Sequence, residues 1–268
     1  MKLLPLVLSA KREEWRMNDS SSEEADNEFA AVRRKARERD DFTCQFCGFR
    51  HPKPDRIGGR DSHYYMQIHH LDDDHHNNTP QNLVCACMHC HAVQHIGLWG
   101  SANEAVIVYL PEMSQMLLNH FCRVVLVAKR FQAKAESDLR TQQERARGGP
   151  PDQHITQRLI SARNMAEATQ AIFDRIRARE AEAQMRLGTS DASDLGTALL
   201  HLPEEEYRKR HKAFAPFRLL LLGHHYPGGR QASQTDAMQE IVDGWITSGP
   251  FSGLDPSGWA RLLQPSGR

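Results

Sequence analysis

Apolar residues in the first 112 positions occur in short runs, separated by polar stretches rich in glycine, proline and charge. Short runs with β-branched or aromatic residues predict strands rather than helices. The predicted strands cover residues 3–8, 64–70 and 105–110. Residues 28–40 have a helical period instead, because Phe29, Val32 and Ala36 fall on one face with arginines around the rest.

The spacing changes after residue 113, where apolar residues recur at a helical period. The predicted helices cover residues 114–147, 155–187, 191–201, 203–214 and 236–246, with a glycine- and proline-rich break at 148–151. The apolar run at 217–222 is consistent with a buried strand or with the end of a helix, and both interpretations stay open.

The order of these elements predicts an α+β protein in which a mixed N-terminal part precedes a mainly helical part. We expect three parts: a metal-bound domain over residues 1–112, a helical domain over 113–222, and a C-terminal helix with a flexible tail over 223–268. The tail is expected to be loose because glycine, proline and serine are frequent after Gly249.

Charge does not identify a ligand for the chain as a whole. The 268 residues contain 34 Lys and Arg and 34 Asp and Glu, which gives a formal net charge of zero. Any affinity for nucleic acid or a membrane surface must therefore be local. The arginine-rich helix at 33–39, with Arg50, Lys53, Arg56 and Arg60, either suits phosphate contacts or is a solvated face.

The N-terminal sequence MKLLPLVLSAKREEW has some features of a signal peptide. Its apolar stretch runs only from Leu3 to Leu8, contains Pro5, and is not followed by a typical cleavage site. No other run approaches the length of a transmembrane helix. We therefore expect a cytoplasmic protein with no transmembrane segment.

Four of the six cysteines form two C-x-x-C pairs, Cys44 with Cys47 and Cys87 with Cys90. In a reducing compartment this spacing indicates a metal site rather than disulfides. Each pair bends the chain so that two thiolates face one ion, and two pairs complete the tetrahedral shell of structural zinc. We therefore predict a Zn²⁺ site with these four cysteines as ligands.

The other two cysteines need no metal. Cys85 lies two residues before the second pair and offers an alternative ligand, although Cys87 with Cys90 repeats the spacing of the first pair. Cys122 lies in an apolar run and fits a small buried hydrophobic residue.

A second group of candidate residues surrounds the cysteine pairs: His69, His70, Asn82, His91 and His95. His91 and His95 are four residues apart, so on a helix their imidazoles share one face and can bind one ion. His69 and His70 are neighbours on a predicted strand and point to opposite faces. One can therefore bind a cation while the other, as a neutral imidazole, accepts a proton from water.

Each of these residues also has a less specific explanation. His95 fits a histidine on a helix surface, and Asn82 fits a helix cap. His75 and His76 lie in a polar loop and are expected to be solvated, and His89, inside the second cysteine pair, is expected on the surface. The order of the whole set around two cysteine pairs favours a metal-dependent site over these separate explanations.

The stretch from CQFC to IHHLDDDHHNNTPQNLVCACMHCHAVQH resembles the HNH (ββα-metal) endonuclease motif over about residues 40–96. The resemblance implies a β-hairpin and a helix that bind one divalent cation, Mg²⁺ or another. It implies that His70 is the general base and that Asn82 steadies it. It further implies that His69, His91 and His95 hold the cation.

A second resemblance spans most of residues 3–222. The segments LLPLVLSAKREEWR, RDDFTCQFCGF, NNTPQNLVCAC, VIVYLPEMSQMLLNHF, GTSD and YRKRHKAFAPFRLLL resemble the IcmJ (DotN) family of type IVB secretion and related conjugation systems. The resemblance implies an HNH-like fold and a role with the coupling ATPase at the cytoplasmic face of the inner membrane. Well-known members of that family keep the zinc cysteines and lose the catalytic histidines, whereas this sequence keeps the histidine set.

Two functions follow as hypotheses. The first is an adaptor in a type IVB coupling complex that binds protein partners, the coupling ATPase among them, through its helical half. The second is a metal-dependent DNA endonuclease or nickase with His70 as general base. A free-standing restriction-like nuclease fits less well, because the helical half contains no recognisable DNA-reading module and the chain is neutral.

Overall fold

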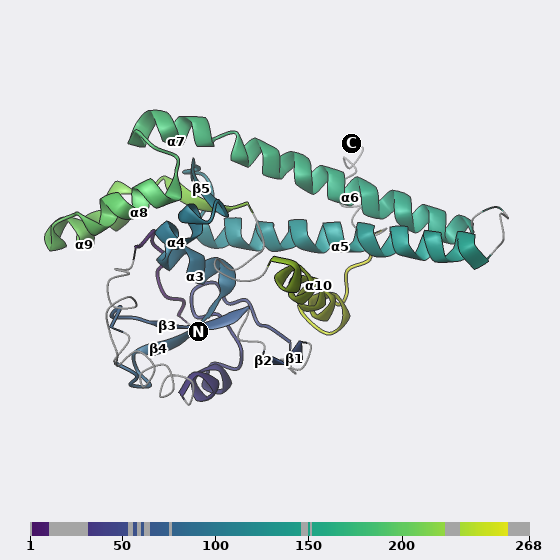
Figure 1. Ribbon diagram of the computed structural model, residues 1–268, viewed down its shortest axis with the longest axis horizontal. Coiled ribbons are helices and arrows are strands. Elements are labelled where there is room, and N and C mark those ends of the chain that lie inside the picture. The colour runs from purple at the N-terminus through teal and green to yellow at the C-terminus, as the bar shows by residue number, and fades with distance from the viewer. Residues whose placement is uncertain are drawn as a thin grey trace, which may run out of the picture.

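Two long antiparallel helices run along one side of the molecule, and a β-hairpin with short helices packs beneath them (Figure 1). This computed structural model describes residues 2–10, 32–52, 56–57, 60–61, 65–74, 77–145, 150, 152–222 and 231–256. The fold is mixed α and β and mostly helical, as predicted. Among the described residues, no helix combines the length and apolarity that crossing a membrane requires.

The central hairpin consists of β3 (Met66–His70) and β4 (Leu83–Cys87), paired antiparallel with His69 opposite Val84. Helix α3 (Met88–Gln94) follows β4 without a loop, and α4 (Ile96–Ser101), which was not predicted, follows after His95. Every residue of β4 is buried, so this strand is covered on both faces. A smaller hairpin joins β1 (Arg56–Ile57) to β2 (Arg60–Asp61).

The apolar run at 217–222 is a strand, which decides between the two interpretations. β6 (Phe217–Leu221) pairs antiparallel with β5 (Ala105–Tyr109), with Leu219 opposite Ile107. On its other edge, β5 is held by a hydrogen bond from the Ile107 amide to the Ser190 carbonyl, at 2.8 Å. The partner strand lies more than a hundred residues away, and local sequence does not reveal such a pairing.

The helical half contains more helices than were predicted. These are α5 (Gln115–Arg145), α6 (Gln153–Arg177), α7 (Glu180–Leu187), α8 (Ala192–Leu200), α9 (Glu204–Ala213) and α10 (Gln231–Thr247). The single helix predicted over 155–187 is therefore two helices, α6 and α7. The break lies at Ala178 and Arg179, where the Arg179 carbonyl accepts a hydrogen bond from the amide of Tyr109 in β5.

The prediction of a strand at residues 3–8 is wrong. No strand is assigned to residues 2–10, and the backbone partners of this segment are a turn and helical residues rather than another strand. The Leu4 amide donates to the Gln45 carbonyl at 2.9 Å, and the Ser9 amide donates to the Val93 carbonyl at 3.0 Å. The segment therefore crosses the first cysteine pair and α3 as an extended chain.

Residues 32–39 form the described part of the helix predicted at 28–40. Of the loop predicted at 224–233, residues 231–233 belong to α10 instead. The predicted loop at 17–27, residues 224–230 and the end of the tail after residue 256 lie outside the described residues. So do His75, His76 and the side chains of Lys53, Arg56 and Arg60.

Helix α10 begins before residue 236 and packs back onto the N-terminal part. The Trp245 indole is fully buried and donates to His51 Nδ1 at 3.1 Å, with its ring edge-on to Phe49 and Tyr65. Residues far apart along the chain, from Leu8 to Trp245, thus belong to one apolar cluster. The division into three domains stays a prediction. Side chains from all three predicted parts pack together in this one cluster.

Helices α4 and α8 approach each other closely at three glycines. A Cβ atom at Gly100 would lie 2.1 Å from the Ser193 backbone nitrogen, and one at Gly196 would lie 2.7 Å from the Gly97 Cα atom. A Cβ atom at Gly97, by contrast, would meet Gly196 Cα at 3.8 Å, an ordinary contact. Glycine is therefore required at Gly100 of α4 and at Gly196 of α8, and it is optional at Gly97.

We expect Gly100→Ala to destabilise the protein, because its methyl group meets backbone that cannot move aside. Overpacking of this kind costs about 1–3 kcal/mol, against the roughly 1 kcal/mol that alanine gains over glycine inside a helix. Gly97→Ala, in the same helix, is the matched control and should be neutral or slightly stabilising. Urea unfolding measures both, and equal stability of the two variants would contradict the assigned packing.

Candidate metal centres

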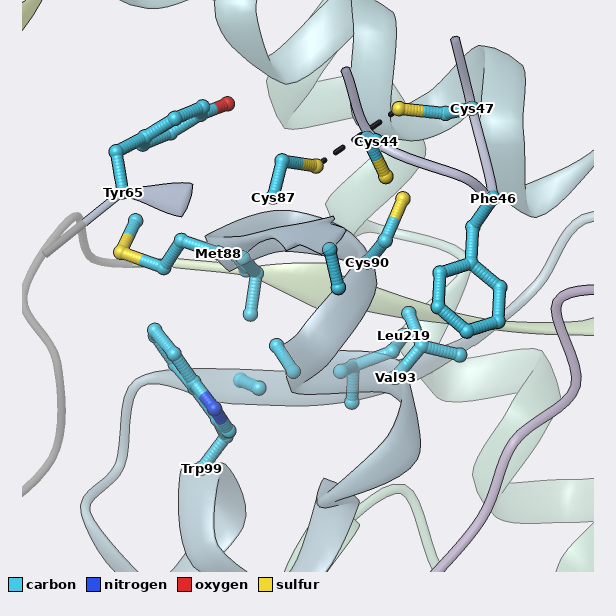
Figure 2. Packing of buried hydrophobic residues seen from close by; sticks show 14 of the residues in the cluster. Cys44, Phe46, Cys47, Tyr65, Cys87, Met88, Cys90, Val93, Trp99 and Leu219 are labelled. Atoms are coloured by element: carbon cyan, nitrogen blue, oxygen red, sulfur yellow. Dashed lines mark hydrogen bonds between the residues drawn. The ribbon is translucent and has the colours of Figure 1, made fainter. Parts of the chain in front are cut away.

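The four cysteines of the two C-x-x-C pairs converge in the core. Their sulfur atoms all lie within 4.8 Å of one another, and the four side chains are buried. Figure 2 shows the four sulfurs pointing toward a common centre. The contact between the Cys47 and Cys87 sulfur atoms, at 3.8 Å, is drawn as a dashed line. Tetrahedral zinc with Zn–S bonds of about 2.3 Å requires sulfur atoms about 3.8 Å apart. The group can therefore hold a metal ion such as zinc.

Local sequence explains the shape of the two C-x-x-C turns, which we call knuckles. In the first, Gly48 has φ 71, a left-handed conformation that suits glycine, and its amide donates to the Cys44 carbonyl at 2.8 Å. In the second, Cys87 ends β4 and Cys90 lies in the first turn of α3, so the strand-to-helix junction brings both sulfurs to one side. Cys85 is not a member of the four-sulfur group. Its backbone is instead paired, with its amide donating to Asp40 and its carbonyl accepting from Gln45.

The four thiols differ in their tendency to ionise. Burial opposes ionisation of the Cys87 thiol, but hydrogen bonds with the other three cysteines and the charge of Arg123 bring its pKa well below the usual value. Burial, with hydrogen bonds to neighbouring thiols, raises the pKa of Cys44 and of Cys90 well above the usual value. A bound cation is therefore needed for all four to act as thiolates.

Two residues of α5 contact the sulfurs, and the sequence analysis did not identify them. An Arg123 Nη atom lies 2.8 Å from Cys87 Sγ and 3.3 Å from Cys47 Sγ, and Asn119 Nδ2 lies 3.3 Å from Cys90 Sγ. Burial alone would lower the pKa of the Arg123 guanidinium, but the charges of Cys87, Tyr65 and Cys47 raise it well above its usual value. The signal for Arg123 was its place inside an apolar helical run, where a charged side chain requires a partner.

The prediction that His89 lies on the surface is wrong. His89 is fully buried, and its Nδ1 atom shares a hydrogen bond of 3.1 Å with the Tyr65 hydroxyl. The Tyr65 hydroxyl also accepts a hydrogen bond from Arg123 Nε at 2.6 Å. The side chain inside the second knuckle is thus part of a buried polar network that reaches the cysteines.

Three of the predicted histidines also come together. His69, His91 and His95 each offer a ring nitrogen, and these atoms lie within 4.8 Å of one another. The Nε2 atoms of His91 and His95 are 3.2 Å apart, close to the roughly 3.3 Å that two imidazoles on one tetrahedral zinc would have. His69 is buried, whereas the other two are half-buried, so this group opens toward solvent on one side.

The remaining two candidates, His70 and Asn82, are not members of this group and have partners in the loop at 72–78. His70 is 1% exposed, and its Nε2 atom contacts Asn78 Oδ1 at 3.0 Å. An amide oxygen can only accept, so this contact places the proton of the neutral ring on Nε2 and the lone pair on Nδ1. The Asn82 side chain donates to Asp72 Oδ1 and to the Asn77 carbonyl, so it fixes the loop that contains Asn78.

The arginines of helix 32–39 have structural contacts. Arg37 is buried and donates to the Met66 carbonyl at 3.4 Å, and Arg39 donates to the Leu83 carbonyl at 2.6 Å. Arg34 pairs with Glu38 on the surface. Two of the arginines that suited phosphate contacts in the sequence therefore attach the helix to the β3–β4 hairpin.

Comparison with known proteins identifies one informative similarity. No protein-family model matches the chain. The chain is similar to the type 4 apparatus protein DotN of Legionella pneumophila, with 35% identity over 126 residues. The match covers 46% of this chain and 52% of that protein, so the chain spans about half the length of the curated relative that it matches.

Loss of the metal should unfold the part of the protein around the four cysteines. Binding free energy of a structural metal is largely folding free energy. We expect the purified protein to contain at least one equivalent of zinc per chain, and we expect chelation to lower its melting temperature. Cys90→Ser should lose the equivalent of zinc held by the four cysteines, whereas Cys85→Ala should keep it. Elemental analysis and thermal melts measure both effects, and a zinc-free protein with an unchanged melt would contradict the assignment.

Proposed function

We propose that this chain is a zinc-stabilised, IcmJ (DotN)-like subunit of a type IV secretion apparatus, and that it acts there as an adaptor. The supporting observation is the 35% identity over 126 residues to a type 4 apparatus protein. In this proposal the four-cysteine centre is structural, since its closed shell of four protein ligands leaves no position for a substrate. The partner is the coupling ATPase, and the location is the cytoplasmic face of the inner membrane.

The helical half is the proposed partner surface. Among the described residues, several of the most exposed large apolar side chains belong to α5, α6 and α7: Leu117, Ile160, Ile172 and Met185. Met185 is 78% exposed, the largest exposed fraction among these apolar side chains. These side chains supply the apolar contacts that protein interfaces concentrate at their centres.

A pull-down from secretion-competent cells tests this function. The tagged wild-type chain should recover the coupling ATPase, and a variant with Ile172→Glu and Met185→Glu should recover several-fold less, because charges would face the partner. Leu71→Glu changes a position on the hairpin loop that is about as exposed as Ile172; it is the control and should bind like the wild type. If the wild type recovers no ATPase, the adaptor function is wrong; if the double variant binds fully, the helical surface is wrong.

A second function is favoured by the histidine group: metal-dependent hydrolysis of a phosphodiester bond in DNA. It is supported by three imidazoles within ligand distance of one another on a hairpin and the helix that follows. Three protein ligands with an open fourth position are typical of catalytic rather than structural sites. Neutral nitrogen donors favour Zn²⁺, Mn²⁺ or another transition metal over Mg²⁺, which prefers oxygen.

In this second function each residue has a separate task. His69, His91 and His95 would hold the cation, and such a cation would supply charge stabilisation to the scissile phosphate and the leaving oxygen. His70 removes a proton from the attacking water at Nδ1, the nitrogen that its contact with Asn78 leaves unprotonated. Asn82 steadies the base indirectly, because its hydrogen bonds to Asp72 and to the Asn77 carbonyl hold the loop next to His70.

Plasmid nicking by the purified chain tests the hydrolytic function. We expect nicking with Mn²⁺ and less with Mg²⁺, and a loss of about 10²–10⁴-fold in His70→Ala, since a general base contributes roughly that much. His211→Ala, which changes an exposed histidine on α9, is the control. Absence of nicking with every cation, or equal nicking by wild type and His70→Ala, would refute hydrolysis at this site.

A further inference from the structure

Arg123 is a charged side chain enclosed by the protein. It is 0% exposed and lies on α5, 36 residues after Cys87 in the sequence. A buried cation is strongly unfavourable unless opposite charge and hydrogen-bond acceptors surround it. The environment of this side chain must therefore supply both.

Acceptors surround all three nitrogens of the guanidinium. One Nη atom donates to Cys87 Sγ and Cys47 Sγ, the other donates to His120 Nδ1 at 3.1 Å, and Nε donates to the Tyr65 hydroxyl at 2.6 Å. His120 is itself fixed by a contact of 3.1 Å between its Nε2 atom and the Cys47 carbonyl. The orientation of the group is thus determined from several sides, with one edge directed at the sulfurs.

The remaining surroundings add to this arrangement. The guanidinium carbon lies 4.3 Å from the centroid of the Phe49 ring, within the range of a cation–π contact. On the same helix, one turn earlier, Asn119 Nδ2 donates to Cys90 Sγ, and Asn119 Oδ1 accepts from Gln115 at 2.9 Å. Helix α5 therefore presents one charged and one neutral donor to the sulfur group.

The contacts of Arg123 with the sulfurs bear on the net charge of the metal centre. A divalent cation with four thiolates carries a net charge of −2, and the four cysteines are buried. Excess charge in a poorly solvated interior disfavours the bound state. A guanidinium in contact with two of the sulfurs halves that excess, and its hydrogen bonds stabilise the thiolate form that binds the metal.

We propose that Arg123 is the buried counter-ion of the four-cysteine centre and sets its metal affinity, as a positioning residue outside the ligand set. This inference rests on the proposed zinc binding at Cys44, Cys47, Cys87 and Cys90. It assigns a metal-related role to a helix that lies outside both cysteine pairs.

Chelator competition on folded protein tests the proposal. Arg123→Met keeps an apolar side chain of similar length without the charge, and it should lower zinc affinity roughly 10–100-fold. Arg123→Lys keeps the charge but cannot contact both sulfurs and Tyr65 together, so its affinity should fall between those of the methionine variant and the wild type. Lys129→Met removes a charge from the exposed side of the same helix and should leave the affinity unchanged.

Cobalt substitution gives a readout that a purely structural role would not change. The sulfur-to-cobalt charge-transfer band of Arg123→Met should move to longer wavelength, because the thiolates lose hydrogen bonds that stabilise their electron pairs. Unchanged affinity and spectrum in Arg123→Met would overturn the proposal even if the variant is less stable. If Arg123→Met does not fold, wild-type affinity and spectrum in Arg123→Lys would overturn it. A wild-type protein that binds no metal would instead refute the zinc site itself.

Discussion

The convergence of four buried sulfur atoms is the constraint on which the rest of the structure depends. The sulfurs lie within 4.8 Å of one another, and they come from a turn, the end of a strand and the first turn of a helix. One ion at their centre would tie the turn at 44–47 to the end of β4 and the start of α3. If the group binds an ion, metal binding and folding of this region should be coupled, because the four cysteines come together only in the folded chain.

The same short helix connects the two candidate centres. Cys90 and His91 are neighbours on α3 and belong to the cysteine group and to the histidine group, respectively. A second link is made by Phe46, which lies between Cys44 and Cys47. Its ring packs edge-on against His69, with the ring centroids 5.6 Å apart. The structural centre therefore positions the histidines, and displacement of one knuckle would alter the geometry of the second group.

The two proposed functions use different parts of the chain and do not exclude each other. Hydrolysis would depend on the β3–β4 hairpin and α3, whereas partner binding would depend on α5, α6 and α7. Contacts between these parts run through α5, whose Arg123 and Asn119 reach the sulfurs, and through α10, whose Trp245 packs on Tyr65. A partner bound to the long helices would therefore contact α5, the helix whose side chains also reach the cysteine sulfurs.

The sequence by itself determined those features that depend on short spacing. Two C-x-x-C turns predict four converging sulfurs, an i, i+4 pair predicts that His91 and His95 share a face, and the helical period predicts α5 and α6. The sulfurs and the two imidazoles do meet, since short spacing limits how far nearby side chains can separate, although His95 ends α3 as its cap instead of lying within the helix.

Only the tertiary structure decided the features that depend on distant partners. The run at 217–222 is a strand because β5 is available to pair with it, and residues 3–8 are not a strand because they lie against a turn and α3 instead. Arg123 and His89 are buried because each finds acceptors or donors on other elements. Local patterns do not encode such partners, since they meet only after the chain has folded and excluded water from between them.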